Sequence, residues 1–125
     1  MAEGRLSNAE FARCLSSLLE GRRLPPDIPA EDAADLALAR RIHDLRRTPP
    51  RLAFGNLALQ EEILRLLTPL SKLRPVERQV LTFHLSAGYS LAVVARLTGR
   101  AETNAITSLR SGLRTLRGHV EKASA

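Results

Sequence analysis

Breaks between short apolar stretches in residues 73–117 constrain the fold of this chain more than any other feature. Pro75 can open a helix, because its fixed backbone angle suits a first helical position, and Ala87-Gly88-Tyr89 interrupts the apolar pattern that follows. Ser90 can cap a short second helix, and Gly99 can end that helix just before a third one. The stretch is therefore predicted to form three helices joined by two turns.

The apolar residues of this stretch recur at the three- and four-residue spacings of amphipathic helices. Residues on such a stripe face the interior when neighbouring helices pack together. Those expected on the inward faces of the three helices are Val80, Leu81, Leu85, Val94, Ala95, Leu97, Leu109 and Leu116. They predict a small trihelical core, which we place within residues 69–125.

Residues 73–117, LRPVERQVLTFHLSAGYSLAVVARLTGRAETNAITSLRSGLRTLR, resemble region 4 of bacterial sigma factors, especially of the extracytoplasmic-function class. They are more distantly similar to the helix-turn-helix of LuxR-type regulators. The match has no gap, covers about a third of the chain, and includes Leu73, Pro75, Arg78, Val80, Leu81, Gly88, Ser90, Ala95, Gly99, Leu109, Leu116 and Arg117. Region 4 reads the upstream promoter element and contacts the flap of RNA polymerase, so the resemblance implies a role in transcription.

The third helix of this unit would carry most of the DNA contacts. The family usually has polar or basic side chains on its outer face, whereas this chain has Ile106 and Leu113 at two such positions. Because Asn and Arg can make bidentate contacts with adenine and guanine, the candidates for base contacts are Thr103, Asn104, Thr107, Ser108 and Arg110. The arginines better suited to phosphate groups are Arg96, Arg100, Arg114 and Arg117.

The distribution of charge supports a polyanionic partner independently of the resemblance. Residues 1–68 contain ten Lys and Arg against ten Asp and Glu, whereas residues 69–125 contain nine against three, so the whole net charge of +6 lies in the second segment. Basic groups that neutralise phosphates release counterions and so bind double-stranded DNA without reading its sequence. The alternative is a basic surface that is simply solvated.

Residues 1–68 are also predicted to be helical, because they show no alternating strand pattern. Ser7-Asn8-Ala9-Glu10 has the pattern of a capping box and predicts a helix over about 7–20. The proline-rich turn 24–29 precedes the acidic start of a second helix, which ends at Arg46-Arg47 and has an apolar stripe of Leu38, Ile42 and Leu45. After Thr48-Pro49-Pro50, a third helix stops before Pro69 and carries Leu59, Ile63, Leu66 and Leu67.

This first segment weakly resembles the cytoplasmic segments of some bacterial anti-sigma factors. The shared pattern is a short Leu-rich helix, a Pro-containing turn, an Ala-Leu-rich helix and Thr-Pro-Pro before another helix. The zinc-binding His and Cys residues of the better-known anti-sigma class are absent. The expected organisation is thus an all-α protein with an interaction or dimerisation segment at 1–68 and the region 4-like domain at 69–125.

Several functions are disfavoured by what the chain lacks. It has no Trp, one Tyr and three Phe, which is too few exposed aromatics for the promoter-melting region 2 of a complete sigma factor. It has no glycine-rich phosphate loop, paired carboxylates or nucleophile motif, so we expect no enzyme and no cofactor. A single Cys and three scattered His predict no metal site.

The location expected from the sequence is the cytoplasm. No apolar run approaches the roughly 20 residues that span a bilayer, and the first residues lead into no signal-peptide core. The composition, with 44% hydrophobic residues, is enough for a core in a soluble protein of this length. We therefore expect no contact with a membrane.

The last predicted helix has a second apolar seam, formed by Ile106, Leu113 and Val120 at seven-residue intervals. Gly112 beside it could allow another backbone to approach closely. Soluble proteins usually cover such a stripe. Two covers remain open: the helices of the first segment, or a second copy of the chain in a homodimer whose symmetry would suit paired DNA half-sites.

Together these patterns predict a DNA-binding transcription regulator that resembles sigma region 4 and lacks region 2. The alternative is a protein-interaction module of the anti-sigma or adaptor type, which binds a sigma factor or RNA polymerase and has reduced DNA binding or none. The two differ in whether the basic residues of the second segment are accessible to a duplex.

Overall fold

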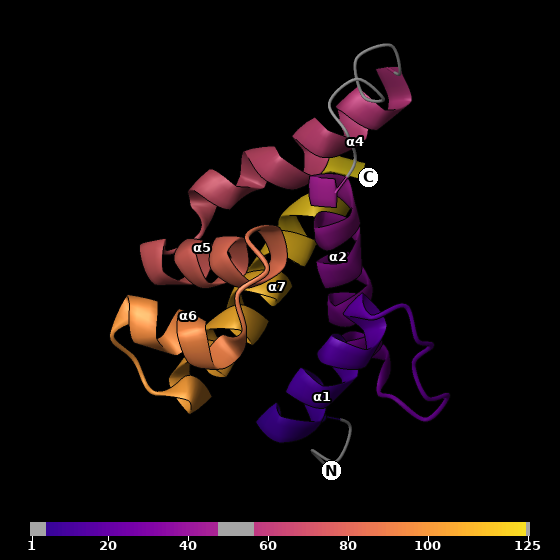
Figure 1. Ribbon diagram of the computed structural model, residues 1–125. Helices are drawn as coiled ribbons and strands as arrows, with labels where there is room; N and C mark the ends of the chain where they lie inside the picture. Colours follow the sequence, from indigo (N-terminus) through magenta and orange to yellow (C-terminus); the bar gives the residue numbers. More distant parts are fainter. Residues whose placement is uncertain (1–4, 48–56, 125) are drawn as a thin grey trace.

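The computed structural model describes residues 5–47 and 57–124 of the chain. All regular elements in these ranges are helical, and no strand occurs in them, so the predicted all-α class is confirmed for this part (Figure 1). The α-helices are α1 (Asn8–Leu19), α2 (Ala30–Arg47), α4 (Leu57–Leu67), α5 (Pro75–Leu81), α6 (Leu91–Thr98) and α7 (Glu102–Ser124). The 3-10 helix η2 (Thr68–Lys72) precedes α5, and the π-helix η3 (Thr82–Ser86) extends it.

The first helix begins where the capping box predicts. The Ser7 hydroxyl accepts a hydrogen bond of 3.1 Å from the Glu10 backbone N–H, and the Glu10 carboxylate accepts one of 2.9 Å from the Ser7 backbone N–H. These bonds satisfy donors that a helix end leaves without partners. The backbone and side-chain hydrogen bonds from Ser7 also lower the pKa of Glu10. The chain leaves α1 through Gly21, whose φ of 91° lies in the left-handed region.

The breaks expected in the second segment are present. Gly88, with a φ of 81°, lies in the turn between η3 and α6, and Gly99, with a φ of 67°, ends α6 in the left-handed conformation that favours glycine. The Ser90 hydroxyl caps α6 by accepting a 3.3 Å hydrogen bond from the Val93 backbone N–H. The predicted positions of these helix ends are therefore confirmed.

Helix α7 forms the centre of the molecule, because most of the other elements pack directly on it. Helices α5 and α6 lie on one side and α1 and α2 on the other, while α4 and η2 meet α7 near its carboxyl end (Figure 1). A single hydrophobic core contains residues from both segments, among them Phe11, Leu15 and Leu36 with Val80 and Leu109. The boundary predicted at residue 68 therefore does not separate two hydrophobic cores.

The apolar seam on α7 is buried within one chain. Ile106, Leu113 and Val120 are 8%, 0% and 8% exposed, and the last two belong to the same core as Phe11 and Leu36 of the first segment. Of the two covers left open by the sequence, the first segment is the one observed for Leu113 and Val120, which share its core. The homodimer stays a prediction, but it is not needed to bury this seam.

One residue expected in the core is exposed. Leu97 keeps 56% of its accessible surface, so its assignment to the trihelical core is wrong. Successive residues of a helix are rotated by about 100°, and α6 turns Val94 and Ala95 inward, which leaves Leu97 about 110° from the direction midway between them. The stripe predicted for α4 consists of Leu59, Ile63, Leu66 and Leu67, whose side chains lie outside what the structure describes. Thr48-Pro49-Pro50 also lies outside the described residues.

Helices α5 and α7 approach closely at Gly112. A Cβ atom at this position would lie 3.1 Å from Leu81 Cδ1 and 3.2 Å from Glu77 Cβ. The Glu77 carboxylate also accepts a 2.6 Å hydrogen bond from the Ser111 hydroxyl, which ties the two helices together. The close approach foreseen at Gly112 is thus made by another helix of the same chain.

Replacement of the two glycines of α7 by alanine should have opposite effects on stability. Gly118→Ala, where nothing lies within 4 Å of the new methyl group, should raise the free energy of unfolding by about 0.5–1 kcal/mol through helix propensity. Gly112→Ala should lower it by about 1 kcal/mol, because the methyl group meets Leu81 and Glu77. Urea unfolding measures both, and equal stabilisation by the two changes would contradict the close packing of α5 on α7.

Candidate nucleic-acid interface

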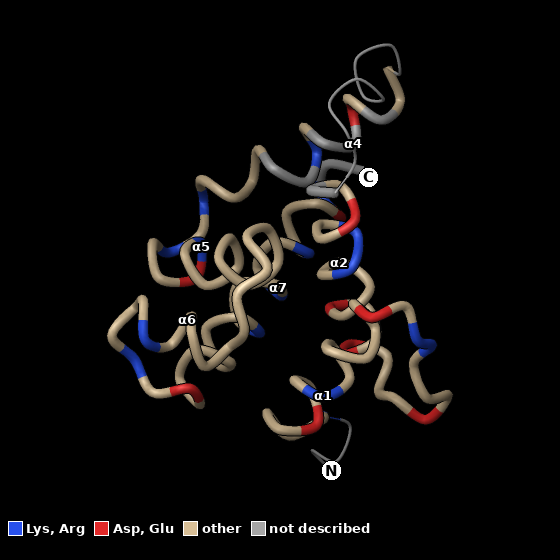
Figure 2. The backbone as a smooth tube through the Cα atoms, viewed as in Figure 1, with Lys and Arg blue, Asp and Glu red and all other residues tan. Residues whose placement is uncertain are grey.

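Three of the arginines assigned to DNA form one row on α7. Arg110, Arg114 and Arg117 are spaced four and three residues apart, which places them on the same face of the helix. This face is turned toward α2, whose first turns carry Glu31, Asp32 and Asp35. Figure 2 shows the basic positions of α7 and the acidic positions of α2 in the middle of the molecule.

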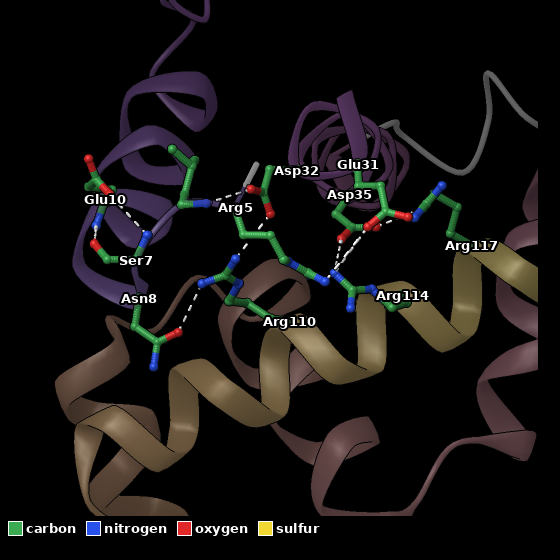
Figure 3. A network of polar contacts seen from close by, with 11 residues as sticks. Arg5, Ser7, Asn8, Glu10, Glu31, Asp32, Asp35, Arg110, Arg114 and Arg117 are labelled. Carbon is green, nitrogen blue, oxygen red and sulfur yellow. Dashed lines mark hydrogen bonds and ion pairs between the residues drawn. The ribbon is translucent and has the colours of Figure 1, made fainter. Parts of the chain in front are cut away.

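Two of the arginines form close ion pairs with buried carboxylates (Figure 3). Arg110 Nη2 lies 3.0 Å from Asp32 Oδ1, and Arg117 Nε lies 2.7 Å from Asp35 Oδ1. Asp32 and Asp35 are 0% and 1% exposed, so each needs a positive partner to remain charged. Both arginines are therefore held inside the protein by α2.

Arg110 also connects α1 to this pair. Its Nη1 donates a 3.0 Å hydrogen bond to Asn8 Oδ1, and its guanidinium lies 4.7 Å from the centre of the Phe11 ring. The Asp32 carboxylate accepts a second hydrogen bond, of 2.7 Å, from the Leu6 backbone N–H. The Arg110–Asp32 salt bridge joins α7 to α2, and its hydrogen bonds to Asn8 and Leu6 connect both helices to α1 and the residues before it. The Arg110 cation over the Phe11 ring adds a further attraction.

Arg114 is less well paired than its neighbours. Its Nη2 lies 3.8 Å from Asp35 and 4.0 Å from Glu31, both too long for a hydrogen bond. Its Nε and Nη2 atoms are shielded from solvent and have no hydrogen-bond partner. Arg5 reaches the same Glu31 carboxylate at 3.7 Å (Figure 3).

Burial and pairing act in opposite directions on Asp35. Burial raises the pKa of its carboxyl group above the ordinary value, and the hydrogen bond and charge of Arg117 only partly offset this effect. For Arg117, burial acts to lower the pKa, but the hydrogen bond to Asp35 and the charges of Asp35 and Glu121 raise it overall. Pairing with Asp35 therefore favours the charged form of Arg117.

The remaining candidates for DNA contact lie on the surface. Arg96, Arg100, Thr103, Asn104 and Thr107 are exposed, and Ser108 is half-buried. Arg96 and Arg100 form no ion pair with any residue that the structure describes. Figure 2 shows basic positions at the end of α6 and in the turn after it, followed by an acidic position where α7 begins. The candidates thus separate into an accessible group at the amino end of α7 and a row that faces α2.

Sequence reasoning missed the partners of this row. The sequence predicts an acidic start for the second helix, which includes Asp32, and its patterns single out neither Asp35 nor Asn8. The available signal was that Asp32 and Asp35 share a face of α2 with Leu36 and Ala39, which are both fully buried. An acidic residue among buried neighbours requires a basic partner, but the sequence does not say which of the arginines supplies it.

Comparison with known proteins adds no assignment, since no family model, no curated protein and no solved structure matches the chain. Among the described helices, none has the length and apolar character needed to cross a bilayer. No cluster of three or more His, Cys, Asp or Glu within residues 5–47 and 57–124 is arranged to hold a metal ion.

Removal of the Asp35 carboxylate should strongly destabilise the protein. Asp35→Asn leaves Arg117 without its closest partner and should cost about 3 kcal/mol of unfolding free energy, because a partly buried charge loses its compensation. The matched control is Glu31→Gln, which removes an exposed carboxylate with long contacts and should cost less than about 0.5 kcal/mol.

Urea unfolding of the single variants Asp35→Asn, Arg117→Gln and Glu31→Gln, and of the double variant Asp35→Asn with Arg117→Gln, tests this coupling. The double variant should lose less stability than the sum of its single changes, because neither charge is then left alone. Strict additivity, or equal losses for Asp35→Asn and Glu31→Gln, would show that the Asp35–Arg117 pair does not hold α2 on α7.

Proposed function

We propose that this protein is a DNA-binding transcription regulator that contacts a duplex through the end of α6 and the amino end of α7. The observation that carries the proposal is the exposure of Arg96, Arg100, Thr103 and Asn104 on adjoining parts of these two helices. The helix order from α5 to α7, the turn at Gly99 and the resemblance to sigma region 4 support a helix-turn-helix with α7 as its recognition helix.

In this proposal the exposed residues have different tasks. Arg96 and Arg100 lie at the edge of the surface and bind phosphate groups, which supplies affinity without sequence preference. Asn104 lies on the first turn of α7 and reads a base edge, since its amide can bond adenine through both a donor and an acceptor. Arg110, Arg114 and Arg117 contribute little while they face α2, so the surface is smaller than the sequence alone suggests.

Substitutions at the amino end of α7 test the proposal. Arg100→Gln should weaken binding to every duplex and reduce the slope of log affinity against log salt by about 0.9, the value for one phosphate contact. Asn104→Ala should instead change the preference among sequences by about 1–3 kcal/mol per base pair that it contacts. Arg117→Gln, matched in charge to Arg100→Gln, should leave the salt slope unchanged.

Fluorescence anisotropy with a labelled duplex at two salt concentrations gives these quantities. Absence of binding to any duplex at about 50 mM salt, where non-specific binding is normally visible, would overturn the proposal. An Arg117→Gln protein with a smaller salt slope than the parent would show that α2 does not cover the arginine row in solution.

The second candidate is a protein-interaction module for a sigma factor or RNA polymerase. It is favoured by the pairing of the arginine row within the chain and by the exposure of Leu97 and Tyr89, 56% and 46%, on and beside α6. Partner surfaces are enriched in such exposed apolar and aromatic side chains. Under this alternative, Leu97→Ser should weaken binding to core RNA polymerase in sedimentation experiments and leave anisotropy with a duplex unchanged.

A further inference from the structure

A cavity lies between the amino-terminal end of α1 and the part of α7 that carries Arg110 and Arg114. Its volume is about 440 Å³, and it is lined by Arg5, Leu6, Asn8, Thr107, Arg110, Ser111, Arg114 and Thr115. Three of these residues are arginines and none is acidic. Its volume falls within the range of roughly 300–1,000 Å³ that is common for sites of small organic ligands.

The arginines around this cavity differ in how closely they are paired with carboxylates. Asp32 and Asp35 are held by Arg110 and Arg117 at 3.0 and 2.7 Å. The carboxylates nearest Arg114 lie at longer distances, Asp35 at 3.8 Å and Glu31 at 4.0 Å, and Glu31 lies 3.7 Å from Arg5. The contacts of Arg5 and Arg114 with Glu31 are therefore weaker than the ion pairs of Arg110 and Arg117.

Arg114 has hydrogen-bonding capacity that the protein does not use. Its Nε and Nη2 atoms have no hydrogen-bond partner, although the side chain as a whole keeps 41% of its accessible surface. A guanidinium group is most strongly bound when it donates parallel hydrogen bonds to two oxygens of one anion. A small rotation of Arg114 toward the cavity would offer such a pair of donors and would break no short contact to Glu31 or Asp35.

We propose that this cavity binds a small phosphomonoester, with Arg114 and Arg5 as the ligands of its phosphate group. The phosphate takes the place of the long contacts to Glu31, and each arginine gains a charge-assisted hydrogen bond. Inorganic phosphate alone would leave most of the cavity empty, so the organic part of the ligand extends along Leu6 and Asn8. This binding site shares Thr107 with the accessible group at the amino end of α7, and its proposal does not depend on DNA binding.

Calorimetric titration of the full chain with inorganic phosphate, adenosine monophosphate and adenosine tests the proposal. Adenosine monophosphate should bind more tightly than inorganic phosphate, and adenosine should not bind. Arg114→Gln should weaken the binding of adenosine monophosphate at least about tenfold, as expected for the loss of hydrogen bonds to a charged group. Arg23→Gln, which removes an exposed arginine that does not line the cavity, should leave the affinity unchanged.

A second variant should change the affinity for the phosphate compound in the opposite direction. Glu31→Gln removes the carboxylate that competes with the phosphate for Arg5 and Arg114, so it should tighten binding several-fold. Because Glu31 is exposed, circular dichroism should show a folded protein for this variant. Loss of binding in Arg114→Gln together with a gain in Glu31→Gln supports the site.

Three results would overturn it: no binding of either phosphate compound, equal affinity for adenosine and its monophosphate, or equal affinities of Arg114→Gln and Arg23→Gln. A protein that binds duplex DNA but neither phosphate compound would retain the proposed function and lose this site. A protein that binds adenosine monophosphate but no duplex would do the reverse. The two proposals can therefore fail separately.

Discussion

Two carboxylates inside the protein, those of Asp32 and Asp35, determine how its two segments fit together. A buried negative charge is tolerated only beside a positive group, and here the partners come from α7, 78 and 82 residues further along the chain. Removal of water from such pairs costs free energy that their attraction only partly returns, so their main effect is on specificity. They allow α2 to pack on α7 in a single register, which in turn places α1 over Arg110 and buries the apolar seam.

Local features of the fold could be predicted from the sequence because each depends on a few adjacent residues. The Ser7–Glu10 capping box, the Ser90 cap and the left-handed Gly99 are interactions over three or four residues, and all are present as expected. The error at Leu97 has a different cause, since its helix has only eight residues and its orientation depends on how Val94 and Ala95 meet α7. In so short a helix, an apolar residue on the flank looks the same in the sequence as one in the core.

The candidate site was only partly predictable, because charge in a segment is not the same as charge on a surface. The net charge of +6 does lie in residues 69–125. However, the neutral first segment presents the carboxylates of Glu31, Asp32 and Asp35 to α7, so Arg110 and Arg117 are neutralised by residues remote in sequence. The resemblance to region 4 assigns α7 an outward face, and it carries no information about a preceding segment that packs on that face. The amino end of α7 lies beyond the reach of α2, and there the assignment of exposed residues agrees with the structure.

The proposed DNA contact is compatible with a first segment that stays closed on α7. To make the arginine row accessible, α2 would have to leave α7, which would expose Leu113 with part of the shared core and strip Asp32 and Asp35 of their partners. A few new phosphate contacts, each weakened by salt, would contribute less free energy than the protein loses with a buried core face and two ion pairs. Contact through Arg96, Arg100 and Asn104 requires no such opening, because these residues are already exposed. The same reasoning favours a first segment that stays in place in the proposed complex with DNA and presents its own features, such as the cavity beside Arg114, on the flank of that complex.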